Sequence, residues 1–119
     1  MKTTVVKKVA KLDGFNIVKF QFVTHFFVED ISVSDNEING LVLLVFNNGI
    51  DSGNFVKLLV DQGVYKTPQT VKNYICRLKK NEFITKKNNE IFLSDKLQMV
   101  ADINNNILLD YKFYYEVHD

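Results

Sequence analysis

Apolar residues in the first part of the chain follow a spacing of two, which is the spacing of a β-strand. Residues 3–11 are rich in β-branched side chains, Asp13-Gly14 is a typical turn pair, and residues 15–28 are mostly Phe, Val, Ile and Thr. One face of the second segment would carry Val18, Phe20, Phe22, Thr24 and Phe26. The pattern predicts an N-terminal β-hairpin over residues 1–33.

The spacing becomes helical at Ser34. Ser34-Asp35-Asn36-Glu37 is a capping box, in which the serine and glutamate side chains satisfy free backbone N–H groups. A second helix is indicated from Ser52 to Gln62, and a third from Thr67 to Asn81, where Pro68 occupies the first helical position. We therefore expect helices near 34–47, 52–62 and 67–81. The apolar stripe of the first is Ile38, Leu41, Val42, Val45 and Phe46.

The third helix is followed by hairpin signals. Residues 83–87 and 90–94 flank Asn88-Asn89, a pair that tolerates positive φ, and Ser94-Asp95 can cap a short helix through Ala101. Residues 107–117 alternate as a strand, and we expect this strand to share a sheet with residues 18–26, within one chain or across a dimer. The result is one α+β domain over residues 1–119, with an N-terminal hairpin (1–33), a helical core with a hairpin (34–95) and a C-terminal helix and strand extension (96–119).

Charge is unevenly distributed along the chain, although the net charge is only +1. Residues 64–88 carry seven basic side chains and one acidic one, Glu82, while residues 28–63 carry one basic and six acidic side chains. A localised basic segment of this kind attracts a phosphate backbone; a solvated lysine-rich face is the plainer alternative. The fourteen lysines against one arginine are typical of AT-rich coding, which is compatible with a phage or low-GC bacterial source.

A helical wheel separates the third helix into an apolar arc and a polar arc. Val71, Tyr74, Ile75 and Leu78 form the apolar arc, which is expected to be buried. Arginine can bind guanine, asparagine and glutamine can bind adenine, and lysines at the flank are suited to phosphates. The predicted contact residues of this helix and the turn before it are Lys66, Gln69, Thr70, Lys72, Asn73, Arg77 and Lys80.

Gly63-Val64 and the run from Thr67 to Ile84 resemble the turn, recognition helix and strand entry of winged helix-turn-helix DNA-binding proteins. Those proteins typically have glycine-valine, then threonine-valine, then a leucine shortly before glycine-aromatic-isoleucine. The resemblance covers about half of the chain and implies a winged helix-turn-helix core. It also implies that Gln69, Thr70, Asn73 and Arg77 face bases, and that Lys86 and Lys87 in the wing touch the DNA backbone or minor groove. The pattern's glycine is Glu82 here, so we expect Asn81 to take the left-handed conformation.

Enzymatic function is disfavoured by the sequence. His25 and His118 lack carboxylates or cysteines at metal-ligand spacing, Cys76 is expected at the border of the polar arc, and no glycine-rich phosphate loop is present. We expect no catalytic, metal or cofactor site. No apolar run is long enough to cross a membrane, and lysines interrupt any signal-peptide core, so we expect a cytoplasmic protein, or a virion protein if it is a phage component.

Two functions remain open from the sequence. The first is a small transcriptional regulator that binds double-stranded DNA as a homodimer through its terminal strands. The second is a structural or adaptor protein, such as a phage virion component, that uses the same body to contact protein partners.

Overall fold

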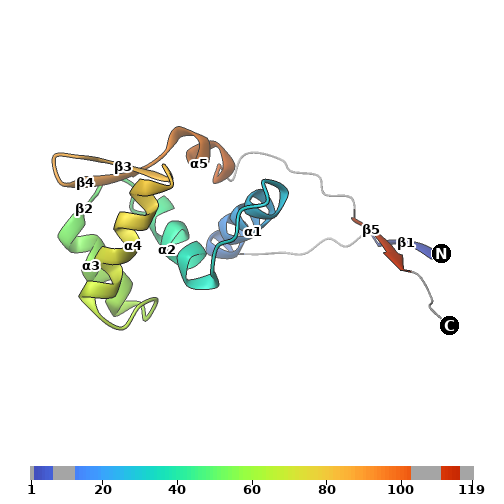
Figure 1. Cartoon of the computed structure of the whole chain (residues 1–119), viewed down its shortest axis with the longest axis horizontal. Helices are drawn as coiled ribbons and strands as arrows, with labels where there is room; N and C mark the ends of the chain where they lie inside the picture. The colour runs from blue at the N-terminus through green and yellow to red at the C-terminus, as the bar shows by residue number, and fades with distance from the viewer. Residues whose placement is uncertain (1, 7–12, 103–110, 116–119) are drawn as a thin grey trace.

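The structure is a computed structural model that describes residues 2–6, 13–102 and 111–115, and it is an α+β fold (Figure 1). The described part contains five helices and a three-stranded antiparallel sheet, together with a two-stranded pair. The elements in chain order are β1 (Lys2–Val6), α1 (Gly14–Val28), α2 (Asp35–Val45), β2 (Ile50–Asp51), α3 (Ser52–Asp61), α4 (Pro68–Lys80), β3 (Ile84–Lys87), β4 (Glu90–Leu93), α5 (Asp95–Val100) and β5 (Tyr111–Tyr115).

The segment from Gly14 to Val28 is a helix, so the predicted N-terminal hairpin is wrong. Asp13 does not form a turn but caps the helix, because its side chain accepts a hydrogen bond from the Asn16 backbone N–H at 2.8 Å. Val18, Phe22 and Phe26 are buried against α2 and α5. Their spacing of four fits both a strand and a helix, and long-range packing decided between the two despite the β-forming composition.

Helices α2, α3 and α4 confirm the three predicted helices to within two residues at each end. Both halves of the capping box at Ser34 are formed. Ile38, Leu41 and Val42 are buried as expected, and Val45 is half-buried. Phe46 is exposed, because α2 ends at Val45 and the chain turns there.

The three-stranded sheet has the order β2-β4-β3 and is antiparallel throughout. The predicted hairpin is confirmed: Asn88 and Asn89 form its turn with φ of 48° and 68°, the conformation that two-residue hairpin turns require. The short strand β2 was not predicted, and it joins the sheet opposite β4 directly before α3. The predicted short helix after Ser94 is also present as α5.

The terminal strands pair with each other, with Lys2 opposite Tyr115 and Val6 opposite Tyr111. The expectation that residues 107–117 share a sheet with residues 18–26 is therefore wrong, since the latter belong to α1. Strand β5 occupies the described part of the predicted strand, and residues 107–110, 116 and 117 lie outside the described residues.

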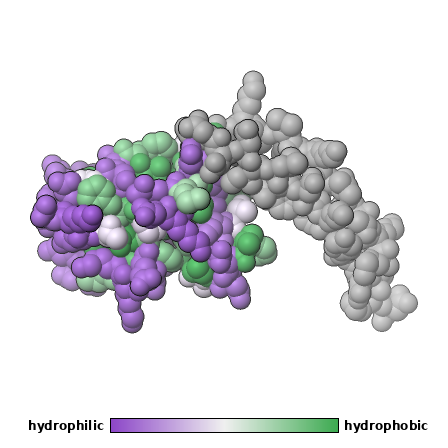
Figure 2. Space-filling model, turned by 90° about the horizontal axis from the view of Figure 1, so that it is seen from above, coloured by the Kyte–Doolittle hydropathy of each residue, from purple (hydrophilic) through white to green (hydrophobic). Residues whose placement is uncertain are grey.

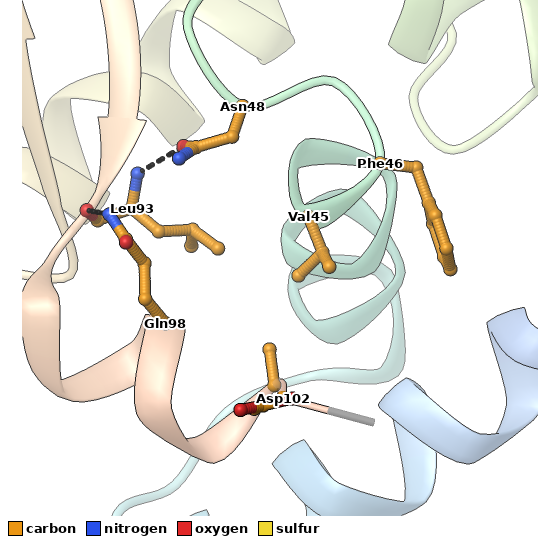
Figure 3. Close-up of a pocket in the computed structure, with 7 residues that line it drawn as sticks. Val45, Phe46, Asn48, Leu93, Gln98 and Asp102 are labelled. Carbon is orange, nitrogen blue, oxygen red and sulfur yellow. Dashed lines mark hydrogen bonds between the residues drawn. The ribbon is translucent and has the colours of Figure 1, made fainter. Parts of the chain in front are cut away.

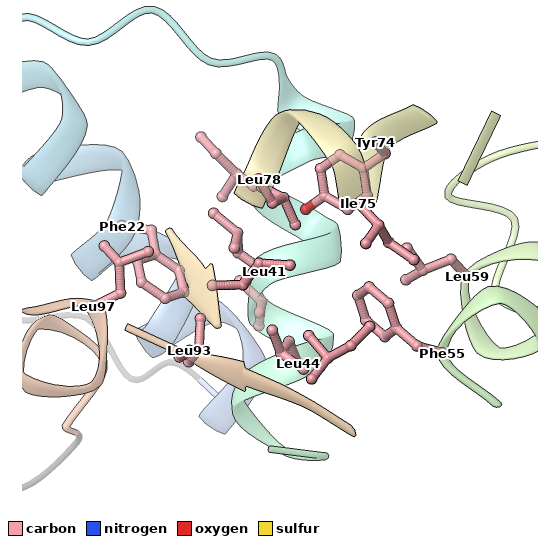
Figure 4. Packing of buried hydrophobic residues seen from close by; sticks show 14 of the residues in the cluster. Phe22, Leu41, Leu44, Phe55, Leu59, Tyr74, Ile75, Leu78, Leu93 and Leu97 are labelled. Carbon is pink, nitrogen blue, oxygen red and sulfur yellow. The ribbon is translucent and has the colours of Figure 1, made fainter. Parts of the chain in front are cut away.

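One hydrophobic core joins the helices to the three-stranded sheet (Figure 4). Tyr74 of α4 is fully buried, and its hydroxyl donates a hydrogen bond to the Glu37 carbonyl of α2 at 2.5 Å. Gly40 leaves room for this ring, because a Cβ at position 40 would lie 2.5 Å from the Tyr74 hydroxyl. The α2–α4 contact thus depends on a glycine and a buried tyrosine, which together fix how closely α4 approaches the body.

Candidate nucleic-acid interface

The local sequence sets the start of α4 and presents its polar face. After α3, Gly63 adopts a φ of +72°, and the Val64 N–H donates to the Leu59 carbonyl at 3.0 Å. Thr67 caps α4 by accepting a hydrogen bond from the Thr70 N–H at 3.3 Å, and Pro68 follows at the first turn. The turn before α4 is therefore held by hydrogen bonds at the end of α3 and at the start of α4.

The apolar arc predicted for α4 is buried, and the polar arc is exposed. Val71, Tyr74, Ile75 and Leu78 are all in the core. Every residue predicted to contact nucleic acid has an exposed side chain. These residues are Lys66, Gln69, Thr70, Lys72, Asn73, Arg77 and Lys80, together with Lys86 and Lys87 of β3.

Two exposed side chains of α4 are tied to each other. The Gln69 side-chain amide donates to the Asn73 side-chain oxygen at 3.1 Å, one helical turn away. This bond places two amide groups side by side on the exposed face of α4. Amides of this kind can offer both a donor and an acceptor to a base edge.

Arg77 lies over an aromatic pair, which the sequence did not reveal. Its guanidinium carbon is 5.9 Å from the centre of the Tyr74 ring, within the usual range of a cation–π contact. The Tyr65 ring lies 5.1 Å from the Tyr74 ring. Burial raises the pKa of the Tyr65 hydroxyl, Glu37 adds to the increase, and Arg77 opposes it. Arg77 is thus exposed, and the two tyrosines beside it restrict where its guanidinium group can lie.

The two wing lysines have different surroundings. Successive residues of a strand point to opposite faces, so Lys86 lies on the face of the sheet that carries Ile84, and Lys87 lies on the other face. Lys87 is opposite Glu90, which is in turn opposite Asp51, so two carboxylates share its face. Lys86 is opposite the apolar Ile91. Positive potential at the hairpin should therefore come mainly from Lys86.

The basic residues between 64 and 88 are free of ion pairs in the part of the chain that the structure describes. The ion pairs found there join Lys19 to Asp35 at 2.8 Å and Lys96 to Glu29 at 3.6 Å, both outside this segment. In Figure 2, hydrophilic residues cover most of the end of the body that carries the β3–β4 turn. The positive charges of α4 are therefore available to an external anion.

Glu82, and not Asn81, adopts the left-handed conformation after α4, with a φ of +61°. Asn81 has a φ of −83° and ends the helix without entering the left-handed region. The expectation for Asn81 is wrong by one residue. The position where the resembling proteins have glycine is the one that needs positive φ, and a glutamate occupies it here.

The histidine and cysteine positions offer little chemistry. His25 lies on α1, not on a strand as expected, and partial burial together with nearby Lys96 lowers its pKa. Cys76 is exposed, and His118 lies outside the described residues. Among the described residues, no group of three or more His, Cys, Asp or Glu side chains is arranged to hold a metal ion.

Within the described residues, every helix is too short or too polar to span a bilayer.

A cavity of about 340 Å³ lies between the end of α2, β4 and α5 (Figure 3). Two of its polar side chains bind the backbone of Leu93: the Asn48 side-chain oxygen accepts from the Leu93 N–H at 2.8 Å, and the Gln98 amide donates to the Leu93 carbonyl at 2.9 Å. These bonds end β4 and begin α5. The amide groups thus serve the fold, and the cavity does not contribute to the basic surface.

Comparison with protein-family models, with curated proteins and with solved structures finds no match for this chain.

Proposed function

We propose that residues 34–95 form a winged helix-turn-helix and that the chain is a small regulator that binds duplex DNA with α4. The observation that carries the proposal is the outer face of α4, which is polar and basic, contains no acid and takes part in no ion pair among the described residues. The sheet order β2-β4-β3 behind three helices also supports it, because a wing follows the recognition helix in this arrangement.

In this proposal the exposed residues of α4 have two roles. Arg77, Asn73 and Gln69 read base edges in the major groove, and Lys66, Lys72 and Lys80 bind phosphates on either side. The tyrosine pair beneath Arg77 reduces the freedom that its side chain loses on binding. Lys86 adds a phosphate contact from the hairpin, and Lys87 adds less because Glu90 lies opposite it.

The test is fluorescence anisotropy of the full chain on random AT-rich duplexes and on a preferred site selected from them. Arg77→Ala and Asn73→Ala should each cost about 1–3 kcal/mol on the preferred site and leave random DNA almost unaffected. Lys86→Ala should weaken binding to all sequences and reduce the salt slope by about one. Lys87→Ala should reduce the slope less, and Lys57→Ala on α3 is the matched control outside the surface. Absence of binding at about 50 mM salt, where non-specific attraction is strong, would refute the proposal.

A second function, a protein-binding adaptor, is favoured by one observation. Helix α1 exposes large apolar side chains on its outer side, and exposed apolar patches commonly mark protein contacts. If duplex DNA does not bind, the basic face of α4 is better assigned to an acidic protein surface, and the chain to a structural assembly.

A further inference from the structure

Helix α1 is apolar on its outer side as well as on its core side. Val18, Phe22 and Phe26 are in the core, whereas Phe27 is 84% exposed and Val28 74% exposed. Phe20 and Val23, at 43% and 44%, lie on the same outer side as Phe27. An α-helix that is apolar all round is normally buried all round. We name the set Phe20, Val23, Phe27 and Val28 the outer face of α1.

The outer face has the spacing of a helix-pairing seam. Phe20, Val23 and Phe27 are separated by three and then four residues, which is the a/d spacing of a coiled coil. The ionisable side chains of α1 are Lys19, which pairs with Asp35, and His25, which lies near Lys96. The seam itself carries no charge, so a second, identical seam can approach it without repulsion.

The exposed apolar area of the outer face is close to the apolar share of a standard dimer interface. With about 150–250 Å² for a whole aromatic side chain, the outer face exposes roughly 400–500 Å² of apolar surface. A standard interface buries about 800 Å² on each partner, and homodimer interfaces are about 65% apolar. The outer face therefore supplies most of the apolar area of one half of such an interface.

The outer face also lies away from the basic surface. Helix α1 packs on α2 and α5, and α2 lies between α1 and α4 (Figure 1). Hydrophobic residues are more frequent toward the α1 end of the body in Figure 2. We propose that the outer face of α1 is the interface between two copies of this chain, related by a two-fold axis near Val23. Both α4 helices stay uncovered in this dimer.

The first test measures mass by light scattering over a range of protein concentrations, without DNA, so that it is independent of DNA binding. The full chain should be a dimer at high concentration, and Phe27→Lys should weaken self-association by at least about tenfold. Phe46→Lys is the matched control, because Phe46 is an exposed phenylalanine at the end of α2, outside the outer face. A chain that is monomeric at every concentration, or a dimer that Phe27→Lys and Phe46→Lys affect equally, overturns the proposal.

The second test does not introduce a charge and so covers the case in which Phe27→Lys fails to fold. In a two-fold pair of α1 helices, parallel or antiparallel, Val23 can face its own copy. Val23→Cys in a Cys76→Ser background should therefore form an inter-chain disulfide quickly under mild oxidation. Lys57→Cys on α3 in the same background is the control. Cross-linking at position 23 that is no faster than at position 57 overturns the proposal.

Discussion

Replacing Gly40 with alanine places a methyl group inside the contact between α2 and α4. The added Cβ would lie 2.5 Å from the Tyr74 hydroxyl and 2.7 Å and 2.8 Å from two ring carbons. The ring cannot move away freely, because Tyr74 is fully buried and the Tyr65 ring lies 5.1 Å from it at a tilt of 45°. Overpacking of this kind costs about 1–3 kcal/mol, while alanine gains roughly 1 kcal/mol over glycine in a helix interior.

Because contacts of 2.5–2.8 Å are far inside the ordinary distance, the overpacking cost should lie in the upper part of its range, at about 2–3 kcal/mol. We therefore expect a net loss of about 1–2 kcal/mol in the free energy of unfolding, measured by urea denaturation with circular dichroism. Gly14→Ala in α1 is the matched control, because the nearest atom to its new Cβ is Phe46 Cζ at 3.6 Å, an ordinary van der Waals distance. It should change stability by less than about 0.5 kcal/mol. In a Tyr74→Leu background, Gly40→Ala should cost less than in the wild type, because the clashing ring is gone. A Gly40→Ala protein as stable as the wild type would refute the close packing of α4 on α2.

Three further predictions concern local features. Ser34→Ala should destabilise the fold by about 1 kcal/mol in the same denaturation assay, because it removes the N-cap of α2. Burial and nearby Lys96 lower the pKa of His25, so the free energy of unfolding should be highest above pH 6.5, the ordinary pKa of histidine, and should fall as the pH drops below that value. Urea unfolding above and below pH 6.5 should show a smaller fall in this free energy for His25→Gln than for the wild type. Glu82→Gly should raise the melting temperature, because it relieves a positive φ at a cost of about 1–2 kcal/mol in residues with a Cβ, whereas Asn81→Gly should not.

The helical core was predictable because its signals are local. The capping box at Ser34, the Thr67-Pro68 start and the Asn88-Asn89 turn act within a few residues, and each formed where the pattern placed it. The burial of the apolar arc of α4 followed from spacing alone. Such features depend on neighbouring residues and not on the rest of the fold.

Helix α1 was not predictable in this way. The positions of Val18, Phe22 and Phe26 satisfy strand and helix spacing alike, and the β-branched and aromatic composition favoured the wrong choice. The same mistake gave β5 a partner it does not have, since its partner is β1. Strand pairing between distant segments depends on the whole fold, and the alternation of one strand does not identify its neighbour.

The sequence predicted which side chains of the candidate site are exposed, but it did not predict their contacts with the rest of the fold. Spacing placed Gln69, Asn73 and Arg77 on the polar arc of α4, and their exposure confirms that placement. The position of Arg77 over Tyr74 requires the ring to be buried against Gly40, and the position of Lys87 opposite Glu90 requires the register of the hairpin. Both are consequences of tertiary structure.

The two proposals together make a prediction that neither makes alone. If two chains pair through α1 and each presents α4 to DNA, the dimer contacts about twice as many phosphates as one chain, and the salt slope of binding scales with that number. Phe27→Lys should therefore reduce the salt slope of binding to about half and lower the affinity for a DNA site with two half-sites. The affinity of each chain for random DNA should change little. Anisotropy titrations at several salt concentrations measure this, with Phe46→Lys as the control for added charge. A Phe27→Lys protein that is monomeric in solution but keeps the full slope would mean that each chain binds DNA independently of the α1 interface.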